Sequence, residues 1–123
     1  MQTFKTIAAQ GEITIRRIGP VPAKATLPQG YTPLAVEDGR YIVGHSETGH
    51  HHVMSAAGAS VAVLDKPPEG MRILRAIVEK ATTLEHLRGF DTHAPIRIEP
   101  GLYEFLIGRE YDPYEEIARR QAD

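Results

Sequence analysis

Glycine and proline turn signals divide the chain into short apolar segments. The 123 residues include 11 glycines and 9 prolines, and pairs such as Gly19-Pro20, Asp38-Gly39 and Pro100-Gly101 recur along the sequence. Glycine adopts positive φ at no steric cost, whereas proline fixes φ and lacks a backbone donor, so both residues favour turns. This punctuation favours many short strands over long helices.

Alternating apolar residues predict strands between the turns. In residues 12–18 (EITIRRI), Ile13 and Ile15 share one face, as alternate residues of a strand do. The predicted strands cover residues 12–18, 34–36, 41–43, 52–54, 60–64, 96–98 and 103–107. Asp38-Gly39 predicts a hairpin that joins 34–36 to 41–43. Four prolines within 20–33 predict an irregular covering segment there.

Residues 71–88 carry two conflicting patterns. Apolar residues recur at helical spacing: Leu74, Ile77, Val78, Ala81, Leu84 and Leu87. Against a helix stand the β-branched residues Ile77, Val78, Thr82 and Thr83, the lack of a cap, and strands on both sides. We therefore predict two strands with a break near Lys80.

The end of the chain has the signals of a helix. Asp112 is a capping residue, Pro113 suits the first helical position, and Glu115 completes a capping-box-like pair. A short C-terminal helix is predicted over about 112–122. The whole is predicted to be one domain, 1–123, that is mainly β: a small barrel or sandwich over about 10–108 followed by the helix.

Composition excludes several classes of partner. With 14 basic and 16 acidic residues, well mixed, the chain lacks the positive surface that nucleic acid or an anionic membrane would require. It also lacks the run of about 20 apolar residues needed for a membrane span. We predict a soluble, cytoplasmic protein. Because there is no cysteine, any metal must bind nitrogen or oxygen.

The segment 44–54 (GHSETGHHHVM) contains four of the six histidines. On a strand, His50 and His52 project to the same face and His51 to the other. Two such imidazoles can converge on one metal ion, with metal–nitrogen distances of about 2.0–2.1 Å. A metal site is the prediction, and the alternative is a metal-free polar cluster. His51 is excluded as a ligand.

Further ligands must come from elsewhere in the chain. His45 and Glu47 can fold back beside the pair because glycines 44 and 49 flank them, whereas His86 and His93 must arrive from another strand. For His86, an inward-facing histidine with satisfied hydrogen bonds is an equal alternative. Mixed imidazole and carboxylate ligation suits a divalent metal such as zinc, iron, nickel, manganese or copper.

Four motifs resemble a family of small uncharacterised bacterial and phage-island proteins. They are QGEITI, GHSETGHHHV, HAPIRIEPGLYEF and REYDP, which spread over most of the chain from about Gln10 to Asp123. The resemblance implies a small barrel and no particular activity.

The histidine pair also resembles the first motif of the cupin superfamily, in which histidines and a glutamate hold a metal inside a β-barrel. Pro100-Gly101 is similar to the second cupin motif, but the glutamate expected after the pair is missing, and Tyr103 stands where a histidine is expected. A cupin-like or jelly-roll barrel would therefore have rearranged ligands, with Glu47 ahead of the pair and His93 or His86 as the third imidazole.

Two functions follow from these patterns. One is an enzyme whose metal activates water or oxygen, or polarises a carbonyl, for a small-molecule ligand. The other is a non-catalytic structural or interaction module, of phage-derived origin in one version, in which a metal is structural or absent. A homo-oligomer is compatible with either.

Overall fold

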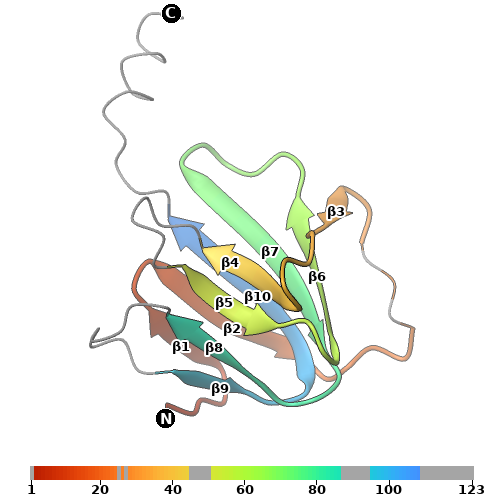
Figure 1. Cartoon of the computed structure of the whole chain (residues 1–123). Coiled ribbons are helices and arrows are strands. Elements are labelled where there is room, and N and C mark those ends of the chain that lie inside the picture. The colour runs from red at the N-terminus through yellow and green to blue at the C-terminus, as the bar shows by residue number, and fades with distance from the viewer. Residues whose placement is uncertain (1, 25, 27, 45–50, 87–94, 109–123) are drawn as a thin grey trace, which may run out of the picture.

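The chain forms two antiparallel sheets that pack against each other (Figure 1). The computed structural model describes residues 2–24, 26, 28–44, 51–86 and 95–108. One sheet has six strands in the order β1-β2-β10-β7-β6-β3, and the other has four in the order β4-β5-β8-β9. The strands are β1 (Ile7–Gln10), β2 (Ile13–Gly19), β3 (Tyr31–Pro33), β4 (Arg40–Gly44), β5 (His52–Ser55), β6 (Ala59–Leu64), β7 (Met71–Val78), β8 (Thr82–His86), β9 (Ile96–Ile98) and β10 (Gly101–Gly108).

Alternation along the strands creates the core between the two sheets. In β10, the side chains of Tyr103, Phe105 and Ile107 face inward and are almost wholly buried, as their spacing predicts. The four-stranded sheet contributes Met54 and Leu84, both inaccessible to solvent. Because one cluster of buried side chains draws on both sheets, the apolar contacts between the sheets hold the fold together.

The mainly β prediction is confirmed, and the arrangement is a two-sheet sandwich. Of the two predicted alternatives, barrel and sandwich, the described strands form the sandwich, because they do not close into one sheet. At one edge, residues 34–36, predicted as a strand, form no ladder, although Leu34 N donates to Val61 O at 2.9 Å. At β9, the edge strand of the four-stranded sheet, an isolated bridge joins Gln2 to Ile96.

The predicted Asp38-Gly39 turn is confirmed. Asp38 and Gly39 have φ of 53° and 74°, the positive values that this type of turn requires. Glu37 and Arg40 exchange two backbone hydrogen bonds of 2.8 and 3.1 Å across it. The first arm of the hairpin is reduced to Glu37, so β4 obtains its ladder from β5 instead.

Residues 71–86 form two strands, β7 and β8, as predicted. The break falls at residues 79–81, where Glu79 N and Lys80 N both donate to Gly58 O, at 2.7 and 3.2 Å. The apolar residues at helical spacing form strands because β7 lies between β6 and β10 and forms ladders with both.

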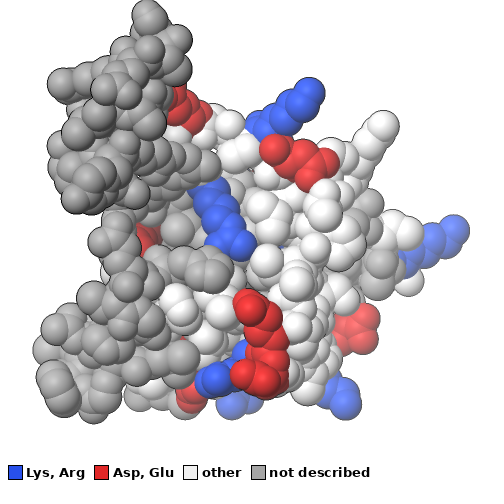
Figure 2. Space-filling view, turned by 45° about the horizontal axis from the view of Figure 1, so that its top comes forward, with Lys and Arg blue, Asp and Glu red and all other residues white. Residues whose placement is uncertain are grey.

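The predicted C-terminal helix, 112–122, lies outside the described residues. Among the described residues, none forms a helix of the length and apolar character that a membrane span needs. On the face shown in Figure 2, acidic and basic side chains of the described residues are interspersed, and neither sign forms a large patch.

Candidate metal site

Two of the six predicted metal ligands, His52 and His86, face each other across neighbouring strands. They are direct partners in the β5–β8 register. Their ring centroids are 4.3 Å apart, and the ring planes are inclined by 31°. The other four predicted ligands, His45, Glu47, His50 and His93, lie outside the described residues.

His52 is the first residue of β5 and lies inside the sandwich. Its side chain is 5% exposed and shares a face with Met54 of the core, as the strand spacing predicts. His51, the excluded histidine, is half-buried and precedes the strand. A buried imidazole requires hydrogen-bond partners. For His52, the opposite sheet supplies such a partner.

Gln10 holds the His52 ring from β1. Gln10 is 2% exposed, and its side-chain amide donates from Nε2 to Leu84 O at 3.2 Å. That bond orients the amide so that Oε1 lies 2.7 Å from His52 Nδ1 and must accept a hydrogen from it. In the neutral ring the proton therefore sits on Nδ1, and Nε2 carries the lone pair.

Gly44 gives the His52 ring its space. Gly44 is opposite His52 in the β4–β5 register, after an irregularity in that ladder. A Cβ at Gly44 would lie 2.9 Å from Ile13 Cδ1 and 3.3 Å from His52 Cδ2. Any other residue at 44 would therefore push against the edge of the ring next to Nε2.

His86 ends β8 on the same face as Leu84. It is half-buried, and its Nδ1 atom is inaccessible to solvent. Strand β8 therefore brings His86 beside His52.

Arg72 connects the two sheets at the same end of the sandwich. Its Nη1 donates to Val43 O at 3.1 Å, one residue before Gly44. Burial lowers the pKa of Arg72 from its ordinary value, because desolvation disfavours the charged guanidinium. The bond helps fix β4, which carries the glycine beside His52, against β7.

The described residues alone do not complete a metal site. Within them, no group of three or more histidine, aspartate or glutamate side chains could hold an ion. What they provide is one imidazole with a fixed tautomer, a second imidazole beside it and an amide that supports the first. Sequence reasoning missed Gln10, whose only signal was a polar side chain at the end of the segment IAAQ.

Comparison with known families places the chain. Residues 9–107, most of the described sandwich, match the family model described as a domain of unknown function, DUF8820. The chain belongs to the DUF8820 family. Membership of an uncharacterised family agrees with that part of the prediction made from the sequence. The DUF8820 match includes Gln10, Gly44, His52 and His86. No curated protein and no solved structure matched the chain.

Proposed function

We propose that this DUF8820 protein binds a divalent transition metal ion between His52 and His86. The further ligands come from His45, Glu47, His50 and His93, which flank these two strands in the sequence. The single observation that carries the proposal is the pair of imidazoles 4.3 Å apart, one of them locked by Gln10.

The spacing of the rings supports this proposal. Two imidazoles that share an ion at about 2.0–2.1 Å have ring centres roughly 4.5–5.2 Å apart, at bond angles between about 90° and 109°. The observed 4.3 Å is close to that separation.

The supporting amide also favours a metal ligand. Metal-bound histidines usually donate their second ring N–H to a carbonyl, carboxylate or water, which fixes the tautomer and the ring orientation. Gln10 Oε1 performs that role for His52, so Nε2 is the nitrogen that would bind the ion. A buried histidine without a metal also needs such a partner, so the proposal rests on the ring pair and the amide together.

The cupin-like ligand arrangement belongs to this proposal. In it, Glu47 precedes His50 and His52 in the sequence, His86 supplies the third imidazole, and His93 is a further candidate. Zinc, iron, nickel and manganese all suit such ligands. Catalysis would need an open coordination position for water or a small molecule, whereas a closed shell of four protein ligands would make the metal structural.

Cytoplasmic location, a phage-related origin and homo-oligomerisation remain predictions.

Metal content of protein purified without an affinity tag tests the proposal. We expect about one equivalent of metal per chain by elemental analysis, and loss of most of it in His52→Ala and in His86→Ala. His51→Ala is the matched control, because it removes an imidazole next to His52 that lies outside the proposed shell. Circular dichroism establishes that each variant is folded. Metal retained in both folded variants, or absent from the wild type after incubation with each of the four metals, would reject the site.

A further inference from the structure

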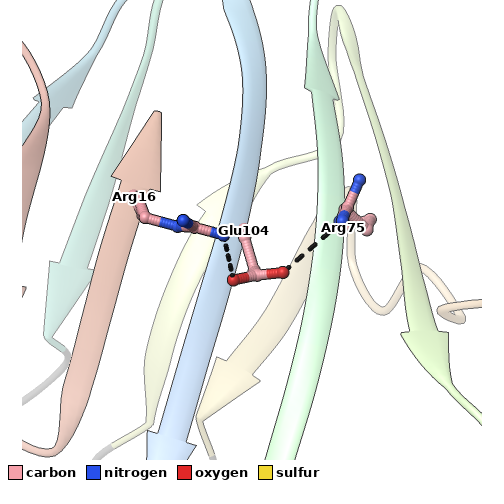
Figure 3. A network of polar contacts seen from close by, with 3 residues as sticks. All are labelled: Arg16, Arg75 and Glu104. Carbon is pink, nitrogen blue, oxygen red and sulfur yellow. Dashed lines mark hydrogen bonds and ion pairs between the residues drawn. The ribbon is translucent and has the colours of Figure 1, made fainter. Parts of the chain in front are cut away.

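A row of charged side chains crosses the outer face of the six-stranded sheet, away from the histidine pair. Arg75 of β7, Glu104 of β10 and Arg16 of β2 are direct neighbours in the two ladders (Figure 3). Glu104 accepts from Arg16 Nη2 at 2.9 Å, and its other oxygen lies 3.5 Å from Arg75 Nη2. The shorter contact makes Arg16 the main partner of Glu104, so the charge of Arg75 is only partly balanced.

Arg75 retains hydrogen-bonding capacity that the described residues do not use. Its Nε is inaccessible to solvent and has no acceptor among them. The guanidinium carbon lies 5.9 Å from the ring centroid of Tyr31, which holds one side of the group. A carboxylate bound beside Arg75 would offer acceptors to the guanidinium donors that Glu104 does not occupy.

Arg75 lines a partly open cavity of about 280 Å³ on this face. Ile77 and Leu102, partners in the β7–β10 ladder, form its apolar floor with Arg75. The proline-rich segment covers the other side through Pro22, Lys24, Thr26 and Pro28. The cavity is therefore bounded by a rigid sheet on one side and by the predicted covering segment on the other.

We propose that this cavity binds a small monocarboxylate with an apolar body. The carboxylate accepts hydrogen bonds from Arg75 and lies near Lys24, while the body packs on Ile77 and Leu102 between the two prolines. Among the described residues, two cations and no acidic side chain line the cavity, and Glu104 contacts Arg75 from outside it, so the charge of the lining favours an anion. A volume just below the usual range of about 300–1,000 Å³ for ligand cavities limits the occupant to a small molecule.

The geometry of arginine favours a carboxylate in particular. A guanidinium presents parallel N–H donors that match the two oxygens of a carboxylate. Inorganic phosphate could satisfy the same donors, but it has no apolar body to cover Ile77 and Leu102. This site is independent of the proposed metal site, because it uses other residues on the opposite face of the six-stranded sheet.

Nuclear magnetic resonance of the arginine side chains tests the proposal on the full chain. The probes are benzoate and hexanoate, with benzamide as the neutral isostere of benzoate and inorganic phosphate as the anion without an apolar body. At concentrations up to about 10 mM, we expect both carboxylates to shift the Arg75 Nε–H signal saturably, and benzamide and phosphate to bind at least about tenfold more weakly.

Three variants locate the binding. Arg75→Gln and Lys24→Gln are expected to weaken benzoate binding, by about tenfold or more for Arg75 and several-fold for Lys24. Arg97→Gln is the matched control: it removes an exposed arginine that pairs with Glu99 and does not line the cavity, so benzoate affinity should change less than about twofold. Because Lys24 is on an exposed segment, its variant reports on binding even if Arg75→Gln fails to fold.

Several results would overturn this assignment. They are the absence of saturable shifts with both carboxylates, equal binding of benzamide or phosphate, and benzoate affinity unchanged in folded Arg75→Gln. If Arg75→Gln does not fold, unchanged affinity in Lys24→Gln decides against it.

Discussion

The histidine pair depends on a small number of buried polar contacts. His52 is held by Gln10, which in turn donates to the backbone of β8, so one amide from the larger sheet aligns two strands of the smaller one. Sequence reasoning identified His52 as inward-facing, because strand alternation requires only local spacing. It did not identify Gln10, because contact between β1 and β5 depends on how the two sheets pack.

Replacing Gln10 tests this alignment. Gln10→Leu removes the acceptor for His52 Nδ1–H and the donor to Leu84 O, and leaves both groups buried. We expect the free energy of unfolding to fall by about 1–3 kcal/mol and, if the metal proposal holds, metal affinity to fall about 10–100-fold. Urea unfolding and metal titration measure the two effects. Gln29→Leu, at an exposed position, is the control, and equal behaviour of the two variants would contradict the role of Gln10.

Tyr103 gives the protein a specific alkaline sensitivity. Its hydroxyl donates to Glu99 O at 2.6 Å. Burial raises the pKa of Tyr103 above the ordinary value of 10.0, although a hydrogen bond and positive charge from Arg17 act in the opposite direction. The folded state thus favours the neutral phenol, and this stabilisation is full below pH 10.0 and is lost as pH rises towards the folded pKa.

Tyr103→Phe should reveal that sensitivity. At neutral pH, loss of the hydrogen bond should lower the free energy of unfolding by about 1 kcal/mol. As pH rises beyond about 10, the wild type should lose stability that the variant does not, and the difference between them should narrow. Urea unfolding at several pH values from neutral to alkaline measures it. A difference that stays constant or widens with pH would contradict the assignment.

At the scale of elements, local signals predicted turns and strand character better than strand pairing. The Asp38-Gly39 turn and the break near Lys80 were both predictable, because each depends on a few adjacent residues. The strand expected at 34–36 is absent. Leu34 N donates to Val61 O of β6, but among the described residues no ladder of hydrogen bonds continues from it. Strand β1 was missed because IAAQ shows no alternation of apolar and polar residues, and its large apolar side chain, Ile7, is 59% exposed.

Two glycines in turns allow the stability cost of backbone strain to be measured separately from the cost of a steric clash. Gly39 and Gly58 have nearly equal positive φ, 74° and 73°. A Cβ at Gly39 would meet nothing within 4 Å, whereas one at Gly58 would lie 2.7 Å from Lys80 Cβ. Gly39→Ala should cost about 1–2 kcal/mol from backbone strain alone, and Gly58→Ala should cost more. Equal losses in urea unfolding would show that the β7–β8 turn yields freely.

At the scale of the whole molecule, the sequence predicted a mainly β fold but left the choice between barrel and sandwich open. That choice depends on pairing between distant segments: β10 lies between β2 and β7, and these contacts cannot be read from local periodicity. The same limit applies to function. His52 and His86 are 34 positions apart by residue number (86 − 52), and only the β5–β8 register brings them together.

The most direct test of the metal proposal is crystallography of the zinc-incubated protein, with anomalous scattering recorded on both sides of the zinc absorption edge. The account predicts one strong anomalous peak within about 2.0–2.1 Å of a nitrogen from each of His52 and His86, with Nε2 as the ligand atom of His52. An ordered pair of rings with no anomalous peak between them, or a zinc ion held only by other residues, would contradict it.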